Sequence, residues 1–387
     1  MKIKICCVDE DGRYGGPQSR MIDIYKKLNK KKFDYFFLIP NNINILKKKL
    51  IKINANFNEI EITRLSKDFF MAFKYMIFFP LEILTLSKFF EEKKFDLIQA
   101  NGVPHFKTII AAKISKIPSL WIIEDSYSPK IILIIFRFLA KIFDSKIIYI
   151  SKKVYSFYLH NLNINKNNIY KVMSPVDTSF YKKKKIFKKK KNFKKKKKLI
   201  ITSVSGIISV KDTETFLHVA NKVISRNENV QFIIAGRGTK NESRYYKKIM
   251  NIYNSFNINI RKKIKFVGMS SNVRKLLDNS DIFLCTSKSE GGPIVVWEAM
   301  SMLLPVVSTK VGGTSEYIKD GYNGFLCDVG DADGLSKKIT ILINNYGIRK
   351  NFALRSRKIA LKLLSSVIIT KKYQRIYEFL HRKLQIK

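Results

Sequence analysis

Cysteine and histidine are scarce in this chain of 387 residues, which contains four of each. The cysteines Cys6, Cys7, Cys285 and Cys327 lie in or beside apolar runs, and no two of them form a Cys-x-x-Cys pair. The histidines are scattered singly. This spacing is atypical of a disulfide framework and of a metal site built from paired ligands. We therefore expect buried free thiols in a reducing compartment.

Long uninterrupted apolar runs are also missing. A membrane-spanning helix needs about 18 consecutive apolar residues, but residues 69–86 are interrupted by Lys74, Pro80 and Glu82, and residues 131–143 by two basic side chains. The first residues, MKIKICCVDE, do not form a signal-peptide pattern. We expect the protein to be made and kept in the cytosol.

Acidic residues are few, 30 against 74 basic ones, which gives a formal net charge of +44. The lysines are spread along the chain together with many Ile and Asn residues, as an AT-rich coding bias would produce. No zinc-finger or RRM-like pattern is present, so we expect no specific nucleic-acid partner. An anionic membrane surface, or an anionic lipid-linked substrate, suits the charge better. Coding bias alone is the alternative.

Short apolar runs alternate with longer helical patterns, which predicts βαβ units and parallel sheets. The predicted fold class is α/β, with two doubly wound, Rossmann-like domains. We expect helices at residues 18–28, 106–114, 213–224 and 335–344. We expect strands at residues 2–8, 35–39, 97–100, 120–123, 147–150, 199–203, 231–235, 264–267, 281–284, 306–308 and 325–327.

The predicted domains are residues 1–177 and 199–365. Between them, residues 178–198 form a lysine-rich linker or loop, because like charges at this density repel and do not pack. A basic membrane-touching patch, in which Phe187 and Phe193 insert, is the alternative. The final residues, 366–387, are expected to form a helix that packs back on the first domain.

Two stretches of the first domain, residues 66–90 and 129–143, mix large apolar side chains with Lys and Arg. This composition is typical of a helix that lies in a lipid interface. The alternative is a helix whose apolar face packs on the core and whose basic face meets solvent.

The segment 287–301, SKSEGGPIVVWEAMS, carries the most informative pattern. Glu290 and Glu298 stand eight positions apart, with a Gly-Gly-Pro turn between them. The glycines let the backbone approach a ligand, and proline suits the first position of a helix. The N-terminus of such a helix favours a phosphate, and the glutamates are acceptors for hydroxyl groups. A nucleotide sugar needs hydrogen-bond donors for its phosphates, with acceptors for its hydroxyl groups on either side.

Further motifs of the second half occur in order at Ser205-Gly206, Lys211, 235–238, 266–268, 280–284, 287–300, 305–309, 312–316 and 320–325. In this ordered series the second half of the chain resembles the donor domain of a retaining glycosyltransferase of family 4, whose two Rossmann-like domains face each other across a cleft in the GT-B arrangement. The first half is similar through Gly15-Gly16-Pro17 and residues 96–101.

The resemblance implies that the second domain binds a nucleoside-diphosphate sugar. Glu290 would hold hydroxyls of the transferred sugar, Glu298 would hold the ribose, and Lys211 would neutralise the departing diphosphate. An arginine usually follows the glycine at 206 in the family, whereas this chain has Ile207, which removes one phosphate clamp. The implied donor-binding residues are Gly206, Lys211, Gly236, Arg237, Glu290, Gly291, Gly292, Pro293 and Glu298.

The helix after the Gly-Gly-Pro turn is itself implied by the resemblance. Its first residues, Ile294-Val-Val-Trp, are β-branched or aromatic and favour a strand by local propensity.

In the first domain, Gly15 and Gly16 lie in the loop after the first strand, where a side chain would block the approach of phosphate or acceptor. Asn101 and His105 follow residues 97–100, at the carboxyl end of a strand, where open parallel sheets bind ligands. We expect these four residues to form the acceptor and phosphate loop. A structural role is the alternative for His105.

Glu124 and Asp125 follow the strand at 120–123, where many family members have a histidine. A carboxylate there accepts the acceptor's proton, supports positive charge at the sugar or binds acceptor hydroxyls. The implied catalytic set is therefore Glu290, Lys211, Glu124 and Asp125.

No metal and no cofactor beside the donor substrate are expected, because Lys211 and a helix dipole take the place of a cation. Asp331-Ala-Asp333 has the spacing of a D-x-D metal motif, but it precedes a helical pattern, and we expect Asp333 to be the N-cap of that helix.

Taken together, the resemblance implies a retaining, metal-independent glycosyltransferase at the inner face of the cell membrane. It would move a sugar to a glycan or lipid-linked acceptor in the synthesis of cell-envelope polysaccharide or lipopolysaccharide. The first alternative is a sugar-nucleotide epimerase on the same fold, which would act on the donor without an acceptor. The second is a non-catalytic basic protein that binds nucleic acid or membrane.

Overall fold

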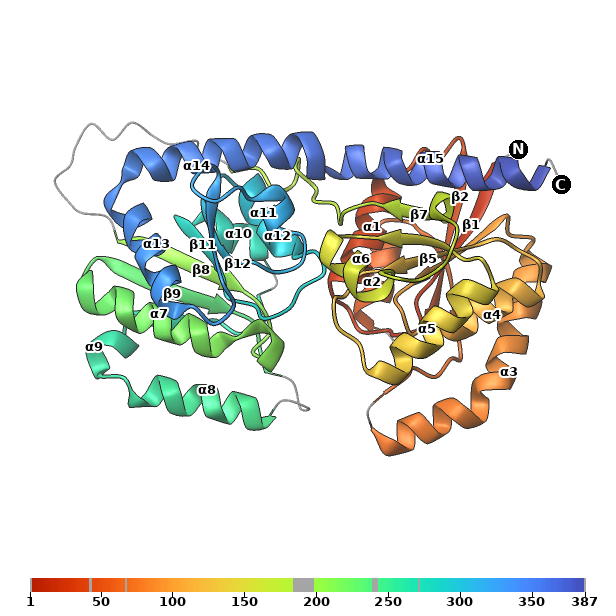
Figure 1. Ribbon diagram of the computed structural model, residues 1–387, viewed down its shortest axis with the longest axis horizontal. Helices are drawn as coiled ribbons and strands as arrows, with labels where there is room; N and C mark the ends of the chain where they lie inside the picture. The colour runs from red at the N-terminus through yellow and green to blue at the C-terminus, as the bar shows by residue number, and fades with distance from the viewer. Residues whose placement is uncertain are drawn as a thin grey trace. The chain divides into compact units, whose positions relative to one another are not determined.

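A computed structural model describes residues 2–41, 44–66, 68–183, 198–238, 243–270 and 272–385. The chain folds into two compact units (Figure 1). Unit 1 comprises Met1–Pro175 and Ser366–Lys387, and unit 2 comprises Val176–Ser365. Most of the lysine-rich stretch, residues 184–197, lies outside the described residues.

Unit 1 is built on a seven-stranded sheet of order β3-β2-β1-β4-β5-β6-β7, in which every pair of neighbours is parallel. The strand order reverses between β1 and β4, and doubly wound sheets bind ligands outside the carboxyl ends of strands at such a point. The strands are β1 (Ile3–Val8), β2 (Phe33–Pro40), β3 (Asn56–Ile60), β4 (Leu97–Asn101), β5 (Ser119–Ile123), β6 (Lys146–Tyr149) and β7 (Ile169–Lys171). The helices are α1 (Gly16–Lys27), α2 (Asn44–Lys52), α3 (Phe69–Lys93), α4 (Phe106–Ile114), α5 (Lys130–Ile142), α6 (Lys152–Tyr158), the 3-10 turn η1 (Lys166–Asn168) and α15 (Ser366–Gln385).

Unit 2 is built on a six-stranded parallel sheet of order β10-β9-β8-β11-β12-β13. Its strands are β8 (Leu199–Val204), β9 (Val230–Ala235), β10 (Ile264–Phe266), β11 (Ile282–Cys285), β12 (Val306–Thr309) and β13 (Gly324–Cys327). Its helices are η2 (Ser209–Lys211), α7 (Thr213–Arg226), α8 (Ser243–Ser255), α9 (Ile258–Arg261), α10 (Val273–Asp278), α11 (Ile294–Ser301), α12 (Thr314–Tyr317), α13 (Ala332–Asn344), α14 (Tyr346–Ile359) and the π-helical segment η4 (Ala360–Leu364).

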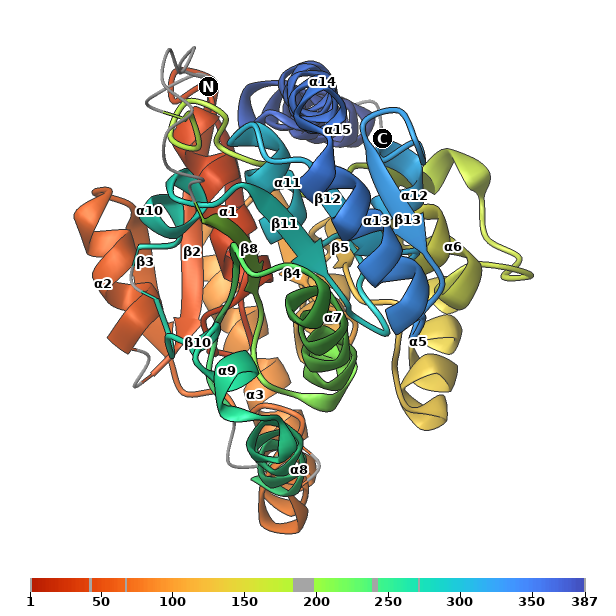
Figure 2. The ribbon, with the colours of Figure 1, turned by 90° about the vertical axis from the view of Figure 1, so that its left-hand side faces the viewer.

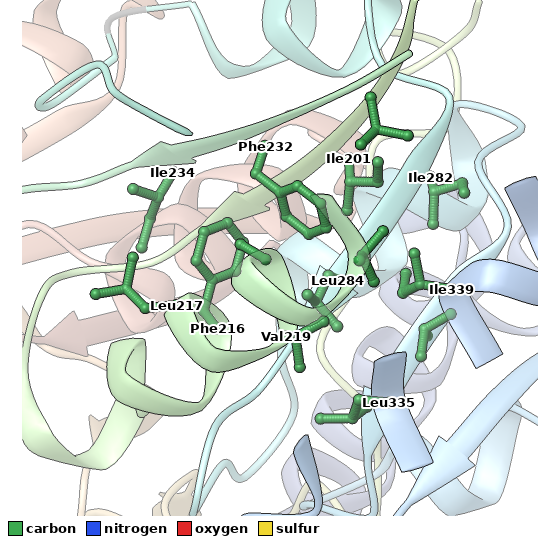
Figure 3. Close-up of a cluster of buried hydrophobic side chains, with 14 of the residues drawn as sticks. Ile201, Phe216, Leu217, Val219, Phe232, Ile234, Ile282, Leu284, Leu335 and Ile339 are labelled. Atoms are coloured by element: carbon green, nitrogen blue, oxygen red, sulfur yellow. The ribbon is translucent and has the colours of Figure 1, made fainter. Parts of the chain in front are cut away.

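The core of unit 2 lies between its sheet and the helices α7 and α13, which pack side by side (Figure 2). Phe216 and Leu217 of α7 contribute to one buried cluster with Phe232 of β9 and Leu335 of α13 (Figure 3). Each large apolar side chain buried in this way contributes about 1.5–3 kcal/mol. The cluster fixes the sheet, and with it the loops that leave the carboxyl ends of the strands.

Helix α15, the last of the chain, completes the core of unit 1. It packs against α1, β1 and β4, and its Tyr373 and Tyr377 side chains are fully buried. The Tyr377 hydroxyl donates to Gln99 Oε1 at 2.5 Å, and Arg20 donates to the Tyr373 hydroxyl at 3.2 Å. The final helix is therefore a structural part of the first unit.

The strands expected from the sequence are all present, with ends displaced by at most two residues. Two further strands, β3 and β7, were not expected, because both lie at edges of the sheet of unit 1 and neither contains a fully buried residue. The helix expected at residues 366–387 is also present, as α15.

One expectation from the sequence, the cap of α13, is wrong. Helix α13 begins one residue after Asp331, so Asp331 is its N-cap, and its Oδ1 accepts from Gly334 N at 2.7 Å. Asp333, the residue expected as the cap, lies in the first turn and pairs with Lys222 at 2.9 Å. Helix α3 continues through Pro80, and among the described residues it is the one helix long and apolar enough to cross a membrane by length and composition.

Candidate functional site

Three loops at the carboxyl ends of β8, β11 and β12 are bonded to one another in unit 2. Lys288 N donates to Val210 O at 2.9 Å, which joins the second loop to the first. Gly313 N donates to Gly291 O at 3.0 Å, which joins the third loop to the second. Because each loop leaves a strand of the same parallel sheet, the three meet at the edge where such sheets bind ligands.

The structure brings Lys211 and Glu290 together at this edge. Lys211 Nζ lies 2.7 Å from Glu290 Oε1, and the Ser287 hydroxyl donates to the same oxygen at 2.8 Å. The Lys211 and Glu290 side chains are 26% and 13% exposed. A cation and a carboxylate therefore stand side by side, partly open to solvent, as a site for an anionic leaving group and a hydroxyl requires.

Two glycines allow these loops to approach closely. Gly312 has a φ of +49°, and a Cβ there would overlap the carbonyl oxygens of Glu290 and Gly291. Gly236, after β9, has a φ of +155°, and a Cβ there would overlap Ser205 O, beside Gly206. Both backbone conformations are ones that residues with a Cβ rarely adopt.

Helix α11 follows the Gly-Gly-Pro turn and begins directly after Pro293. Its β-branched start is helical because Val296 and Trp297 are fully buried in the unit, and tertiary packing overrides local propensity. Glu298 lies on the buried side, 7% exposed. Gly291 and Gly292 are in the turn between the Lys211–Glu290 pair and this helix.

A pocket of about 570 Å³ lies beside the loop after β9. It contains two of the expected donor-binding residues, Gly236 and Arg237, and others that the sequence did not indicate. Its lining comprises Ile207, Gly236, Arg237, Gly238, Ser243, Tyr246, Lys247, Phe266 and Gly268. Tyr246 and Lys247 come from α8, where no motif marks them. Ile207 is 2% exposed and belongs to the core cluster, so the position that holds arginine in the family supplies no charge here.

In unit 1, a buried network joins three elements at the carboxyl edge of the sheet. Arg20 of α1 pairs with Glu124 after β5, and donates to Asn101 Oδ1 of β4 at 2.9 Å. Burial raises the pKa of Glu124 to about 7, although Arg20 opposes the shift. Arg20 is a site residue that the sequence did not reveal, since nothing in its helix distinguishes it. Asp125, the next residue, is exposed.

Asn101 is fully bonded within unit 1. Its Nδ2 donates to Val8 O at 3.0 Å and to Cys7 Sγ at 3.1 Å, and its Oδ1 accepts from Arg20 and from Gln99 Nε2 at 2.9 Å. The amide has no donor or acceptor left for a ligand. We therefore treat Asn101 as a positioning residue for Arg20.

The other three expected positions of this loop, Gly15, Gly16 and His105, lie on the same edge. His105 precedes α4 and is 3% exposed, and burial lowers its pKa to about 4, so its imidazole is neutral. Gly15 precedes α1, whose first residue is Gly16, and Gly15 N donates to Gln18 Oε1 at 2.9 Å. A Cβ at Gly15 would make only ordinary contacts, so the fold itself does not require a glycine there.

Residues 184–359 match the family model described as glycosyl transferases group 1. The matched region contains the three bonded loops, the Lys211–Glu290 pair and the pocket beside β9. The second half of the chain is therefore similar to this family of glycosyltransferases, over slightly less than half of the 387 residues.

Two relatives of this chain differ in how much of it they match. The N-acetyl-alpha-D-glucosaminyl L-malate synthase of Bacillus anthracis is 28% identical over 178 residues, 46% of this chain and 45% of the relative. The chain thus aligns with about half the length of that relative. The N,N'-diacetylbacillosaminyl-diphospho-undecaprenol alpha-1,3-N-acetylgalactosaminyltransferase of Campylobacter jejuni is 24% identical over 377 residues, 92% of this chain and 93% of the relative.

The crystal structure of Anabaena Alr3699/HepE in complex with UDP and glucose is similar to this chain, with a TM-score of 0.81 at 20% identity. The similarity covers 97% of this chain and 99% of that one. The fold is therefore α/β with the two Rossmann-like units of GT-B glycosyltransferases, as expected from the sequence.

Proposed function

We propose that this protein is a retaining, metal-independent glycosyltransferase that transfers a sugar from a nucleoside-diphosphate sugar to a lipid-linked or glycan acceptor of the cell envelope. The observation that carries the proposal is the pair formed by Lys211 and Glu290, 2.7 Å apart, on loops bonded at the carboxyl edge of the unit 2 sheet. Such a pair provides one group for a diphosphate and one for a sugar hydroxyl.

The donor lies in unit 2. The nucleoside occupies the pocket beside Gly236 and Arg237, where Phe266 and Tyr246 supply apolar and aromatic surface. Glu298 accepts from the ribose. Gly206, Gly291 and Gly292 leave room for the diphosphate, and Pro293 starts the helix whose N-terminus faces it. The Anabaena relative, whose crystal structure contains UDP and glucose, supports a uridine nucleotide as the first donor to test.

Lys211 stabilises the negative charge that develops on the leaving diphosphate. As the bond between the sugar and the diphosphate breaks, negative charge accumulates on the leaving oxygen, and a fixed cation stabilises that state more than the ground state. The acceptor hydroxyl forms the new bond to the sugar, and its proton passes to the departing diphosphate. Glu290 holds the hydroxyls of the transferred sugar, and Lys211 takes the role that a metal ion plays in other glycosyltransferases.

The acceptor lies at the carboxyl edge of unit 1, which carries Gly15 and Gly16 at the start of α1, His105 before α4 and the Arg20–Glu124 pair. A Glu124 whose pKa is near 7 holds an acceptor hydroxyl in either protonation state. The full-length Campylobacter relative, whose name specifies a diphospho-undecaprenol acceptor, supports a polyprenyl carrier and a place at the cytoplasmic face of the membrane.

Isothermal titration calorimetry with UDP-, GDP- and ADP-sugars, in the presence of EDTA, tests the donor half. We expect one nucleotide sugar to bind saturably, and Glu298→Ala to weaken it about tenfold or more, as loss of a hydrogen bond to a buried charge does. Glu228→Ala, an exposed position before β9, is the control and should leave binding unchanged. No binding by any donor would refute the proposal. Conversion of the sugar without an acceptor would indicate an epimerase, and a requirement for divalent metal would refute metal independence.

A further inference from the structure

The first half of α3 is an apolar surface that unit 1 leaves open. From Phe69 to Leu84 the helix exposes nine large apolar side chains, and in Figure 1 this part extends beyond the strands of the unit. Phe70 is 78% exposed and Ile77 is 56% exposed. The nine are Phe69, Phe70, Met71, Phe73, Met76, Ile77, Phe78, Leu81 and Leu84. A contiguous exposed patch of this kind marks an interaction surface.

The second half of α3 is fixed by a buried polar network. Glu82 Oε1 accepts from Thr63 N at 2.8 Å, and Glu82 Oε2 accepts from Lys107 Nζ of α4 at 2.5 Å. Lys107 also lies 3.9 Å from Glu10, in the loop after β1, and 4.2 Å from the centre of the Tyr75 ring. Because these contacts hold the helix at its middle, the exposed first half projects from a rigid base.

A pocket of about 340 Å³ lies at that base. Its walls come from the loop after β1, the end of β2, the segment after β3 and the first turns of α3. The lining residues are Glu10, Asp11, Gly12, Arg13, Pro40, Asn41, Ile62, Thr63, Arg64, Met71 and Lys74. The apolar surface of α3 is therefore continuous with the pocket through Met71 and Lys74.

The pocket has an excess of positive charge. Arg13 forms a two-pronged pair with Asp11 at 2.5 and 2.6 Å, and Arg64 lies 3.7 Å from the same carboxylate. Lys74 lies 5.7 Å from the centre of the Phe78 ring. Three cations and two carboxylates, Asp11 and the buried Glu10, line the pocket, which leaves one positive charge in excess. This excess favours an anion, and guanidinium groups match the oxygens of a phosphate.

We propose that the exposed half of α3 lies in the acyl region of a membrane and that the pocket at its base binds the phosphate of a lipid embedded there. This deepens the proposed function and rests on it, because the lipid would be the polyprenyl diphosphate that carries the acceptor glycan, for which undecaprenyl phosphate is the probe. A lipid satisfies both features at once, since its chain covers apolar side chains while its phosphate meets Arg13, Arg64 and Lys74. The charge of +44 favours an anionic surface and opposes a second copy of this chain as the cover.

Flotation with vesicles tests the proposal on the full chain. The vesicles contain phosphatidylcholine alone, phosphatidylcholine with phosphatidylglycerol, or phosphatidylcholine with undecaprenyl phosphate. We expect binding to both anionic vesicles, with the tightest binding to undecaprenyl phosphate. Ile77→Ser should weaken binding to both by about tenfold, the effect of withdrawing one large apolar side chain from lipid. Ile258→Ser in α9, where the side chain is 52% exposed, is the matched control and should bind as the wild type does.

Arg64→Gln separates the pocket from the general charge of the surface. It should remove the preference for undecaprenyl phosphate over phosphatidylglycerol while retaining binding to the latter. Equal loss with both vesicles, or equal binding by Ile77→Ser and Ile258→Ser, would overturn the proposal. The proposal would also be overturned if a low concentration of inorganic diphosphate released the protein from undecaprenyl phosphate vesicles. That result would indicate a site for free phosphate. A dimer that Ile77→Ser dissociates in sedimentation equilibrium would identify a second copy as the cover instead.

Donor titration of the same variants distinguishes this proposal from the proposed function. Both substitutions lie in unit 1, so a folded variant should bind nucleotide sugar in unit 2 as the wild type does. Failure of every donor with intact vesicle binding would refute the enzymatic proposal and leave the lipid surface standing. Intact donor binding, together with unchanged vesicle binding by Ile77→Ser, would refute the lipid surface and leave the enzymatic proposal standing.

Discussion

Replacing Gly312 by alanine tests whether close contact between loops builds the donor site. The new Cβ would incur the left-handed backbone cost of about 1–2 kcal/mol, since φ is +49°. It would also push apart the loops joined by the 3.0 Å hydrogen bond between Gly313 and Gly291, a further cost of about 1 kcal/mol. We expect a loss of about 3 kcal/mol in the free energy of unfolding. We also expect at least about tenfold weaker binding of the nucleotide sugar, because Glu290 is displaced.

Gly321 provides the matched control for this substitution. Its φ is +71°, and a Cβ there meets no heavy atom of the described residues within 4 Å. Gly321→Ala therefore incurs the backbone cost alone, about 1 kcal/mol, and should bind the donor normally. Urea unfolding measures the stability of both variants, and calorimetry measures donor binding. If Gly312→Ala is no more destabilising than Gly321→Ala, the close approach of the loops does not support the site.

Three further predictions concern charged groups. Lys211→Met should lower kcat by about a hundredfold or more with little change in the urea midpoint; an unchanged kcat in a transfer assay would remove Lys211 from catalysis. Arg20→Met should cost about 3 kcal/mol or more of unfolding free energy by leaving the Glu124 carboxylate buried without its partner, and adding Glu124→Gln should restore part of that loss in urea titrations; additive effects would contradict coupling. Burial lowers the pKa of His105 to about 4, whereas Asp11 raises it and Lys107 lowers it further. The unfolded chain therefore binds more protons between about pH 6.5 and 4, stability falls by up to about 3 kcal/mol as the pH drops through that window, and His105→Asn should flatten this dependence in melts across that range.

The sequence predicted the strands well where both faces of a strand are buried. A strand such as β5, with four of its five residues buried, forms an apolar run that stands out from its surroundings. The edge strands β3 and β7 lack such a run, because one side of an edge strand needs no cover. The cap of α13 was misplaced by two residues, since Asp331 and Asp333 are equally good caps by residue type and only the backbone distinguishes them.

The candidate site was predictable in part. The spacing of glycines and glutamates, together with the family resemblance, indicated Lys211 and Glu290, and the structure places both on adjoining loops. The Arg20–Glu124 pair was not predictable, because its members are distant in the chain and meet only through the order of the strands. The sequence also does not indicate that the Asn101 amide forms all of its hydrogen bonds within unit 1.

Unit 1 is interrupted by the whole of unit 2, which has a consequence for synthesis. Strands β1 to β7 are translated first, before Tyr373 and Tyr377 of α15, which contact Arg20 and Gln99 in the finished unit. Until α15 has been translated, Arg20 and Gln99 lack the hydrogen bonds that they form with the hydroxyls of Tyr373 and Tyr377. The unit whose translation begins first is thus completed only after unit 2 has been translated.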